Sequence, residues 1–124
     1  MNIEEFKEKK TWAVVGSVHD HEKYAYKIYN FLKRKGYKVY PVDPSGDMVD
    51  EEKSYKTLTD LPEIPEAVDM VINPIKGSKF VDEANTLGIK YIWFQPGAES
   101  NDIIEKANSL ITNVISNHCV MVEF

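Results

Sequence analysis

A glycine and a serine that could form part of a phosphate-binding turn, Gly16 and Ser17, follow an apolar run at residues 11–15. Glycine lets the backbone come close to a ligand, and the first turn of a following helix would direct free N–H groups toward a phosphate. An ordinary strand-to-helix turn has the same composition, so both interpretations stay open. A full dinucleotide fingerprint needs two more glycines, where this chain has Val18 and His21, and a standard NAD site is therefore not supported.

Charged side chains follow two other predicted strands. Asp43 directly follows the apolar run 38–42. An acid at the end of this strand in dinucleotide-binding folds accepts a hydrogen bond from a ribose hydroxyl. Asp-Pro is also a common opening of a turn, and the two interpretations are equally supported. Lys76 and Lys79 flank the expected start of a helix, where a cation is unfavourable unless it meets an anion. They are candidate phosphate contacts or simply solvated lysines.

The histidines and the cysteine offer two less favoured kinds of chemistry. His19 and His21 stand two residues apart, but a metal needs a third ligand and none is obvious, so no metal site is predicted. His118 and Cys119 are adjacent, and on an extended strand their side chains would point to opposite faces. Cys119 is then a buried apolar residue or a thiol that faces the ligand loops. Because no nucleophile and base pair up, a binding protein is favoured over an enzyme.

Five short apolar runs and three amphipathic stripes must position these residues. We expect strands at 11–15, 38–42, 69–72, 91–94 and from residue 114. Helices are expected where apolar residues recur at helical spacing: Ala25, Ile28, Tyr29 and Leu32; Phe80, Val81, Ala84 and Leu87, with Ser78 as N-cap; and Ile103, Ile104, Ala107 and Leu110. This order predicts a doubly wound α/β fold, a parallel sheet with helices on both faces, whose ligands bind beyond the carboxyl ends of the strands.

Length and charge limit the kind of protein. The 124 residues suit one domain, 1–124, in which residues 1–10 form an N-terminal helix or arm. Twenty acidic residues against 15 basic ones disfavour a nucleic-acid partner. No apolar run approaches the roughly 20 residues that cross a bilayer, which excludes membrane insertion. A single cysteine and a charged N-terminus point to the cytoplasm.

Several short motifs, taken together and in their order along the chain, resemble those of the stand-alone CoA-binding domain family. They are residues 13–17 (AVVGS), 36–39 (GYKV), 41–44 (PVDP), 93–97 (WFQPG) and the late Cys119. The family is related to the CoA-binding segment of the succinyl-CoA synthetase alpha subunit, and the likeness covers residues 11–123. It implies a Rossmann-like sheet of five strands in the order 3-2-1-4-5, and coenzyme A or an acyl-CoA as the small-molecule ligand.

The resemblance also implies roles for individual residues. Gly16 and Ser17 would meet the diphosphate, and the adenosine end would be bordered by Pro41, Val42, Asp43 and Pro44. The crevice would be lined by Asn73, Ile75, Lys76, Gln95, Pro96 and Gly97, and the candidate set is completed by Val18, Tyr24 and Cys119. Many relatives carry a Phe-Arg pair after the third strand, so here a cationic contact would fall to Lys76. Many also carry Asp-Arg before the late cysteine, where this chain has Asn117-His118.

Two other functions remain open at this point. Asp43 would suit an NAD(P)-binding sensor or oxidoreductase domain, although the missing glycines argue against one. The chain could also be an interaction protein with a vestigial nucleotide pocket, because a fold does not determine a function. No heptad pattern stands out, so the oligomeric state stays open.

Overall fold

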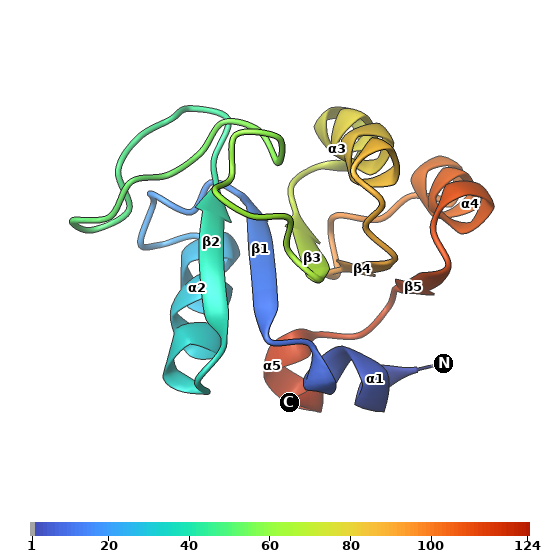
Figure 1. The fold of residues 1–124 in the computed structure, drawn as a ribbon, viewed down its shortest axis with the longest axis horizontal. Coiled ribbons are helices and arrows are strands. Elements are labelled where there is room, and N and C mark those ends of the chain that lie inside the picture. Colours follow the sequence, from blue (N-terminus) through green and yellow to red (C-terminus); the bar gives the residue numbers. More distant parts are fainter. Residues whose placement is uncertain (1) are drawn as a thin grey trace.

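Five parallel strands form the centre of the molecule, and helices cover both faces of the sheet (Figure 1). The computed structural model describes residues 2–124. The strands are β1 (Thr11–Gly16), β2 (Lys38–Val42), β3 (Ala67–Val71), β4 (Tyr91–Phe94) and β5 (Asn113–Ile115). The helices are α1 (Ile3–Glu8), α2 (Tyr24–Arg34), α3 (Pro74–Thr86), α4 (Asn101–Leu110) and α5 (Val120–Glu123). The predicted doubly wound α/β fold is confirmed.

The order of the strands differs from the expected 3-2-1-4-5. The observed order is β2-β1-β3-β4-β5, so β3 pairs with β1 on the side away from β2. The outer edge of β2 is taken instead by the segment that follows it: Tyr55 donates to Pro41 O (3.0 Å) and accepts from the N–H of Asp43 (2.7 Å). With that edge covered, β3 crosses to the other side of β1. The strand order therefore reverses between β1 and β3, where ligands of such sheets bind.

Each face of the sheet carries its own apolar cluster. One joins α3 and α4 to the sheet, and the other joins α1, α2 and α5 to it. The four apolar residues predicted to form the inner stripe of α2 are all buried, as the helical spacing requires. Phe6 of α1 is fully buried and lies edge-on to Trp93 of β4, with ring centroids 5.5 Å apart. The N-terminal segment therefore contributes to the core.

Helix α3 begins four residues before the predicted cap at Ser78. Its N-cap is Asn73, whose side chain accepts from the N–H of Lys76 (3.0 Å), and Pro74 occupies the first turn. Asparagine is a strong N-cap, and proline suits the first turn because its missing N–H would have no partner there. The prediction of Ser78 was wrong for this reason. The earlier start brings the first turn of α3 to the end of β3.

The last strand ends sooner than the sequence suggested. Cys119 is the N-cap of α5 and not a strand residue, so the argument that His118 and Cys119 point to opposite faces of a strand was wrong. His118 Nδ1 lies 3.0 Å from Glu123 Oε2, and Cys119 Sγ accepts from Gln95 Nε2 at 3.2 Å. Within residues 2–124, no helix combines the length and apolar character needed to cross a bilayer.

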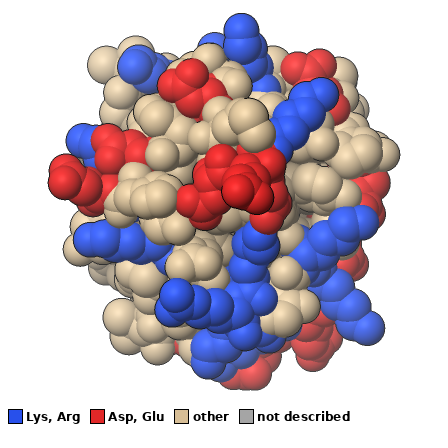
Figure 2. All heavy atoms as spheres, turned by 90° about the vertical axis from the view of Figure 1, so that its left-hand side faces the viewer, with Lys and Arg blue, Asp and Glu red and all other residues tan. Residues whose placement is uncertain are grey.

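Charged side chains of both signs cover the edge of the sheet formed by β2. Figure 2 shows acidic side chains gathered near the middle of this face, with basic side chains around them. Ion pairs join Lys33 to Glu52 and Lys38 to Glu63. The exposed acids Asp47, Asp50 and Glu51 belong to the loop after β2.

Candidate functional site

A cavity of about 610 Å³ opens at the carboxyl edge of the sheet, where the strand order reverses. Ten of the fifteen candidate residues line it: Ser17, Tyr24, Asp43, Pro44, Asn73, Lys76, Gln95, Pro96, Gly97 and Cys119. They come from the ends of β1 to β4, the starts of α2 and α3, and the segment before α5. The fold thus brings together candidates that are more than a hundred residues apart in the chain.

Five candidates lie outside the lining. Val18 is fully buried in the core, Pro41 and Val42 are buried in β2, and the side chain of Ile75 is 90% exposed at the start of α3. Gly16 acts through packing: a Cβ there would lie 2.4 Å from Val71 O and 3.0 Å from the Cβ of Ala25. Only glycine therefore lets the start of α2 approach this close to β1 and β3.

The first turn of α2 lies at the cavity, and no side chain of the described residues caps its N–H groups. Its N-cap, Lys23, makes no side-chain hydrogen bond to the first turn, and this turn holds no acidic residue. In contrast, Asn73 caps α3 and Ser100 caps α4. Lys23, Tyr24 and the small Ala25 all line the cavity. Uncapped N–H groups and the positive end of the helix dipole both favour the binding of an anion at this helix end.

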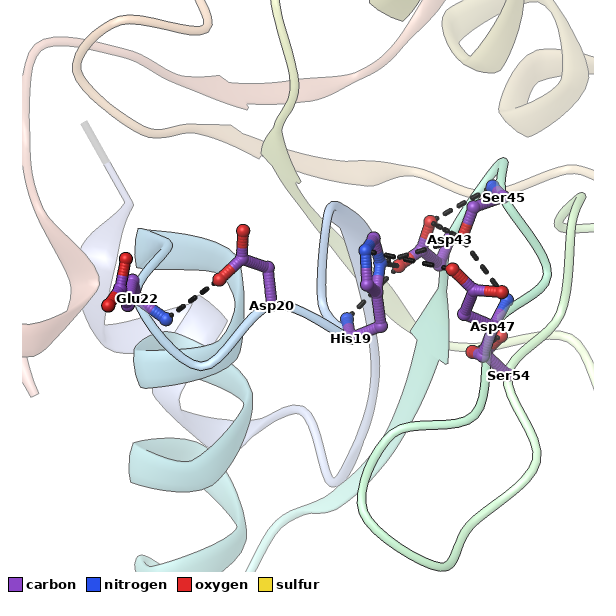
Figure 3. Close-up of polar contacts among 7 residues, drawn as sticks. All are labelled: His19, Asp20, Glu22, Asp43, Ser45, Asp47 and Ser54. Atoms are coloured by element: carbon purple, nitrogen blue, oxygen red, sulfur yellow. Dashed lines mark hydrogen bonds and ion pairs between the residues drawn. The ribbon is translucent and has the colours of Figure 1, made fainter.

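The carboxylate of Asp43 joins two of the loops that surround the cavity (Figure 3). Its Oδ2 accepts from the N–H of His19 (3.0 Å) and lies 2.5 Å from His19 Nδ1. Its Oδ1 accepts from the N–H (3.0 Å) and the hydroxyl (2.8 Å) of Ser45. Burial by itself would raise the pKa of Asp43, but the hydrogen bonds from His19 and Ser45 outweigh it and hold this pKa below its usual value. Asp43 is therefore a buried carboxylate whose two oxygens are both engaged within the protein.

At the other end of the cavity, Gln95 positions the thiol of Cys119. The Gln95 side chain follows β4 and is almost completely buried. Its Oε1 accepts from the N–H of Val120 (3.0 Å), while its Nε2 donates to Cys119 Sγ (3.2 Å). Gln95 thereby holds the start of α5 against the end of β4. The turn that follows passes through Gly97 with φ 94°, a conformation that glycine adopts at little cost.

Seven lining residues were missed by the sequence analysis as parts of this site: His19, Lys23, Ala25, Ser45, Val71, Ile72 and Ala98. Each lies within two residues of a candidate, so proximity in the chain was the available signal. His19 was considered only as a metal ligand. No group of three or more possible metal ligands occurs among residues 2–124.

Comparisons with known proteins agree with the fold described above. A family model described as "CoA binding domain" matches residues 10–124. A hypothetical protein from Pyrococcus horikoshii OT3 is 31% identical, with a TM-score of 0.90 over 98% of this chain and 87% of that one. A conserved hypothetical protein from Pyrococcus furiosus is 33% identical, with a TM-score of 0.85 over 93% of this chain and 99% of that one.

A larger enzyme contains the same fold. In a dinucleotide-forming acetyl-coenzyme A synthetase 1 from Ca. Korarchaeum cryptofilum, 26% of the chain aligns with 91% of this one, at a TM-score of 0.72 and 23% identity. At this identity the likeness shows the fold alone.

Proposed function

The chain belongs to the CoA-binding domain family, and from that premise we propose that its cavity binds coenzyme A or an acyl-CoA without a catalytic cycle of its own. The observation that carries the proposal is the uncapped N-terminus of α2 inside a cavity at the reversal of strand order. Phosphate groups are the anions that such helix ends bind. Lys23 and Lys76 line the same cavity and supply positive charge without a basic surface.

The remaining lining residues suit the other parts of this ligand. The end of β2 would border the adenosine, the end of β1 would meet the diphosphate, and the segments at Gln95 and Cys119 would lie beside the thiol-bearing arm. Asp43 would act by holding the loop walls together, because both of its oxygens are already engaged. This weakens the case for a nicotinamide dinucleotide, which relied on Asp43 as an acceptor for a ribose hydroxyl.

The absence of catalysis in this proposal rests on the geometry of three polar side chains: His19 from the loop after β1, and Asp43 and Ser45 from the loop after β2. Asp43 and Ser45 both approach the same nitrogen of His19, Nδ1, at 2.5 Å and 3.4 Å. A histidine that activates a serine must receive the proton on one nitrogen while a carboxylate holds the other. This arrangement therefore does not provide an activated serine.

The test is ligand binding by thermal shift and calorimetry, with CoA, acetyl-CoA, dephospho-CoA, NAD(H), NADP(H), ATP and FAD. A ligand that binds only the folded chain stabilises it by about 2.7 kcal/mol at 100 times its Kd. We expect stabilisation by the CoA compounds alone. Stabilisation by nicotinamides alone would favour a dinucleotide sensor, and no stabilisation by any compound would favour an interaction protein with a vestigial site.

Lys23→Asp is the most informative variant, because it affects folding and binding in opposite directions. Aspartate at the N-cap satisfies the first-turn N–H groups and stabilises α2 by about 1 kcal/mol. The same carboxylate blocks and repels a phosphate, so CoA affinity should fall at least about tenfold. Lys27→Glu changes the charge equally one turn later on an exposed residue outside the cavity, and serves as the control. Equal losses for both variants would contradict the proposed phosphate site.

The position of the ligand can be tested through Cys119. Because Cys119 Sγ lies at the cavity wall, bound CoA should slow its alkylation by iodoacetamide. Unchanged alkylation at saturating CoA would place the ligand elsewhere.

A further inference from the structure

His19 is a cavity residue whose ring is fixed at one nitrogen only. Its backbone N–H and its Nδ1 both bind Asp43 Oδ2, at 3.0 Å and 2.5 Å. Its other nitrogen, Nε2, lies 3.7 Å from Asp47 Oδ2, which is too far for a hydrogen bond. Figure 3 shows the carboxylates of Asp43 and Asp47 on one side of the ring, and Asp20 and Glu22 on its other side. The ring is therefore held in place while one of its N–H positions remains uncommitted.

We propose that His19 Nε2–H donates a hydrogen bond to a phosphate group of the bound nucleotide, and that this contact makes binding pH-dependent. The inference rests on the proposed function, because it assigns a residue for phosphate recognition within the same cavity. Two lysines that line this cavity, Lys23 and Lys76, come from the starts of α2 and α3. His19 adds a third positive group, from the loop between β1 and α2.

The surroundings of His19 favour its charged form. The hydrogen bond to Asp43 raises the pKa of His19 above its usual 6.5; burial opposes this rise, and the charges of Asp43, Asp47 and Asp20 add to it. Asp43 is a carboxylate at neutral pH because its own pKa is lowered. The charge of Asp47, 65% exposed, is largely screened by water and salt, so it competes only weakly for Nε2. Ser45, which approaches Nδ1 from the loop after β2, is uncharged.

The pH dependence has a definite direction. A phosphate binds the imidazolium better than the neutral ring, so affinity should fall as pH rises through the pKa of His19. A hydrogen bond between charged partners contributes enough to change the Kd by about tenfold to a hundredfold. The second ionisation of a phosphate monoester lies near pH 6. Measurements between about pH 6.5 and pH 8.5 therefore vary the charge of His19 while the ligand changes little.

The experiment is calorimetric titration of the wild-type chain, His19→Gln and His21→Gln with CoA and dephospho-CoA across this pH range. His21 is the matched control: it lies in the same loop, is 61% exposed and pairs with Asp50 at 2.7 Å, but does not line the cavity. We expect wild-type and His21→Gln to lose at least about fivefold in CoA affinity over the range. His19→Gln should bind weakly at every pH and show a flat profile.

The two ligands identify which phosphate His19 contacts. A loss in His19→Gln for CoA alone assigns the 3′-phosphate, and equal losses for both ligands assign the diphosphate. CoA binding that is unaffected by His19→Gln, or a pH profile that the variant keeps, would overturn the inference while leaving the proposed function intact. No CoA binding by the wild type at any pH would overturn both.

A second measurement does not depend on the variant folding correctly. NMR titration of the His19 ring protons in the wild type should give a higher pKa with CoA bound than without it, because the two equilibria are linked. An unchanged pKa of His19 in the complex would contradict the contact.

Discussion

The side chain of Asp69 should lower the stability of this protein, increasingly so as pH rises. Asp69 lies in the middle of β3 and is completely buried, on the face covered by α2 and α5. Its neighbours in register are Val14 of β1 and Trp93 of β4. Neither carboxyl oxygen has a hydrogen-bond partner within the described residues. Complete burial raises the pKa of Asp69 well above its usual value, so the folded chain keeps this group protonated to a higher pH than the unfolded chain does.

The magnitude follows from two separate costs. A buried polar group without a partner costs about 1–3 kcal/mol. In addition, the unfolded chain releases the proton above about pH 4 while the folded chain keeps it. Stability then falls by about 1.4 kcal/mol per pH unit, from about pH 4 up to the raised pKa of the folded state. Asp69→Val removes both costs, and Asp69→Asn removes only the dependence on pH.

The assay is urea unfolding of the wild type and both variants at several pH values from about pH 4 upward. We expect the free energy of unfolding of Asp69→Val to exceed that of the wild type by about 1–3 kcal/mol near pH 4, and the difference to grow by about 1.4 kcal/mol per pH unit above it. Asp60→Asn, at an exposed loop residue, is the control: the pH dependence of its unfolding free energy should be parallel to that of the wild type. If the pH profiles of wild type and Asp69→Asn were parallel, Asp69 would have to be ionised in the folded state, and the reasoning would be refuted.

The remaining predictions concern the packing of Gly16 and two helix caps, and can be checked by urea unfolding. Gly16→Ala should cost about 1–3 kcal/mol, because its Cβ would lie 2.4 Å from Val71 O; an undiminished free energy of unfolding would show that β1 and β3 separate easily here. Asn73→Ala and Ser100→Ala each remove an N-cap, of α3 and of α4. Each should cost about 1 kcal/mol, and a loss in only one of the two would show that the other cap is dispensable.

The fold class was predictable because it depends on local periodicity. The stripe of Ala25, Ile28, Tyr29 and Leu32 lies within one helix, and each of the apolar runs lies within one strand or overlaps it. A parallel sheet with helices on both faces is the arrangement that buries such alternating units. The positions of most candidate site residues followed from the same reasoning, because the carboxyl ends of parallel strands share one edge.

The strand order and the start of α3 were not predicted correctly, for different reasons. The order depends on which strand edge the irregular segment after β2 covers, and this is a contact between Tyr55 and residues more than ten positions away. The cap of α3 did have a local signal, Asn73-Pro74, directly after the strand predicted at 69–72. These two residues begin α3, while β3 ends before them at Val71.

The sequence by itself determined that residues such as Ser17, Asn73 and Gln95 would meet at one edge of a parallel sheet, because that requires only the alternation of strands and helices. The tertiary structure alone decided how the polar groups at that edge are used. His19 and Asp43 are 24 residues apart, and their hydrogen bond engages a carboxylate that the sequence offered to a ribose. Asp69, in contrast, lies between Val14 and Trp93 and finds no hydrogen-bond partner in the part of the chain that the structure describes. A hydrogen bond forms only when the donor–acceptor distance falls within a range of a few tenths of an ångström. For groups distant in the chain, residue types and spacing do not specify this distance so closely.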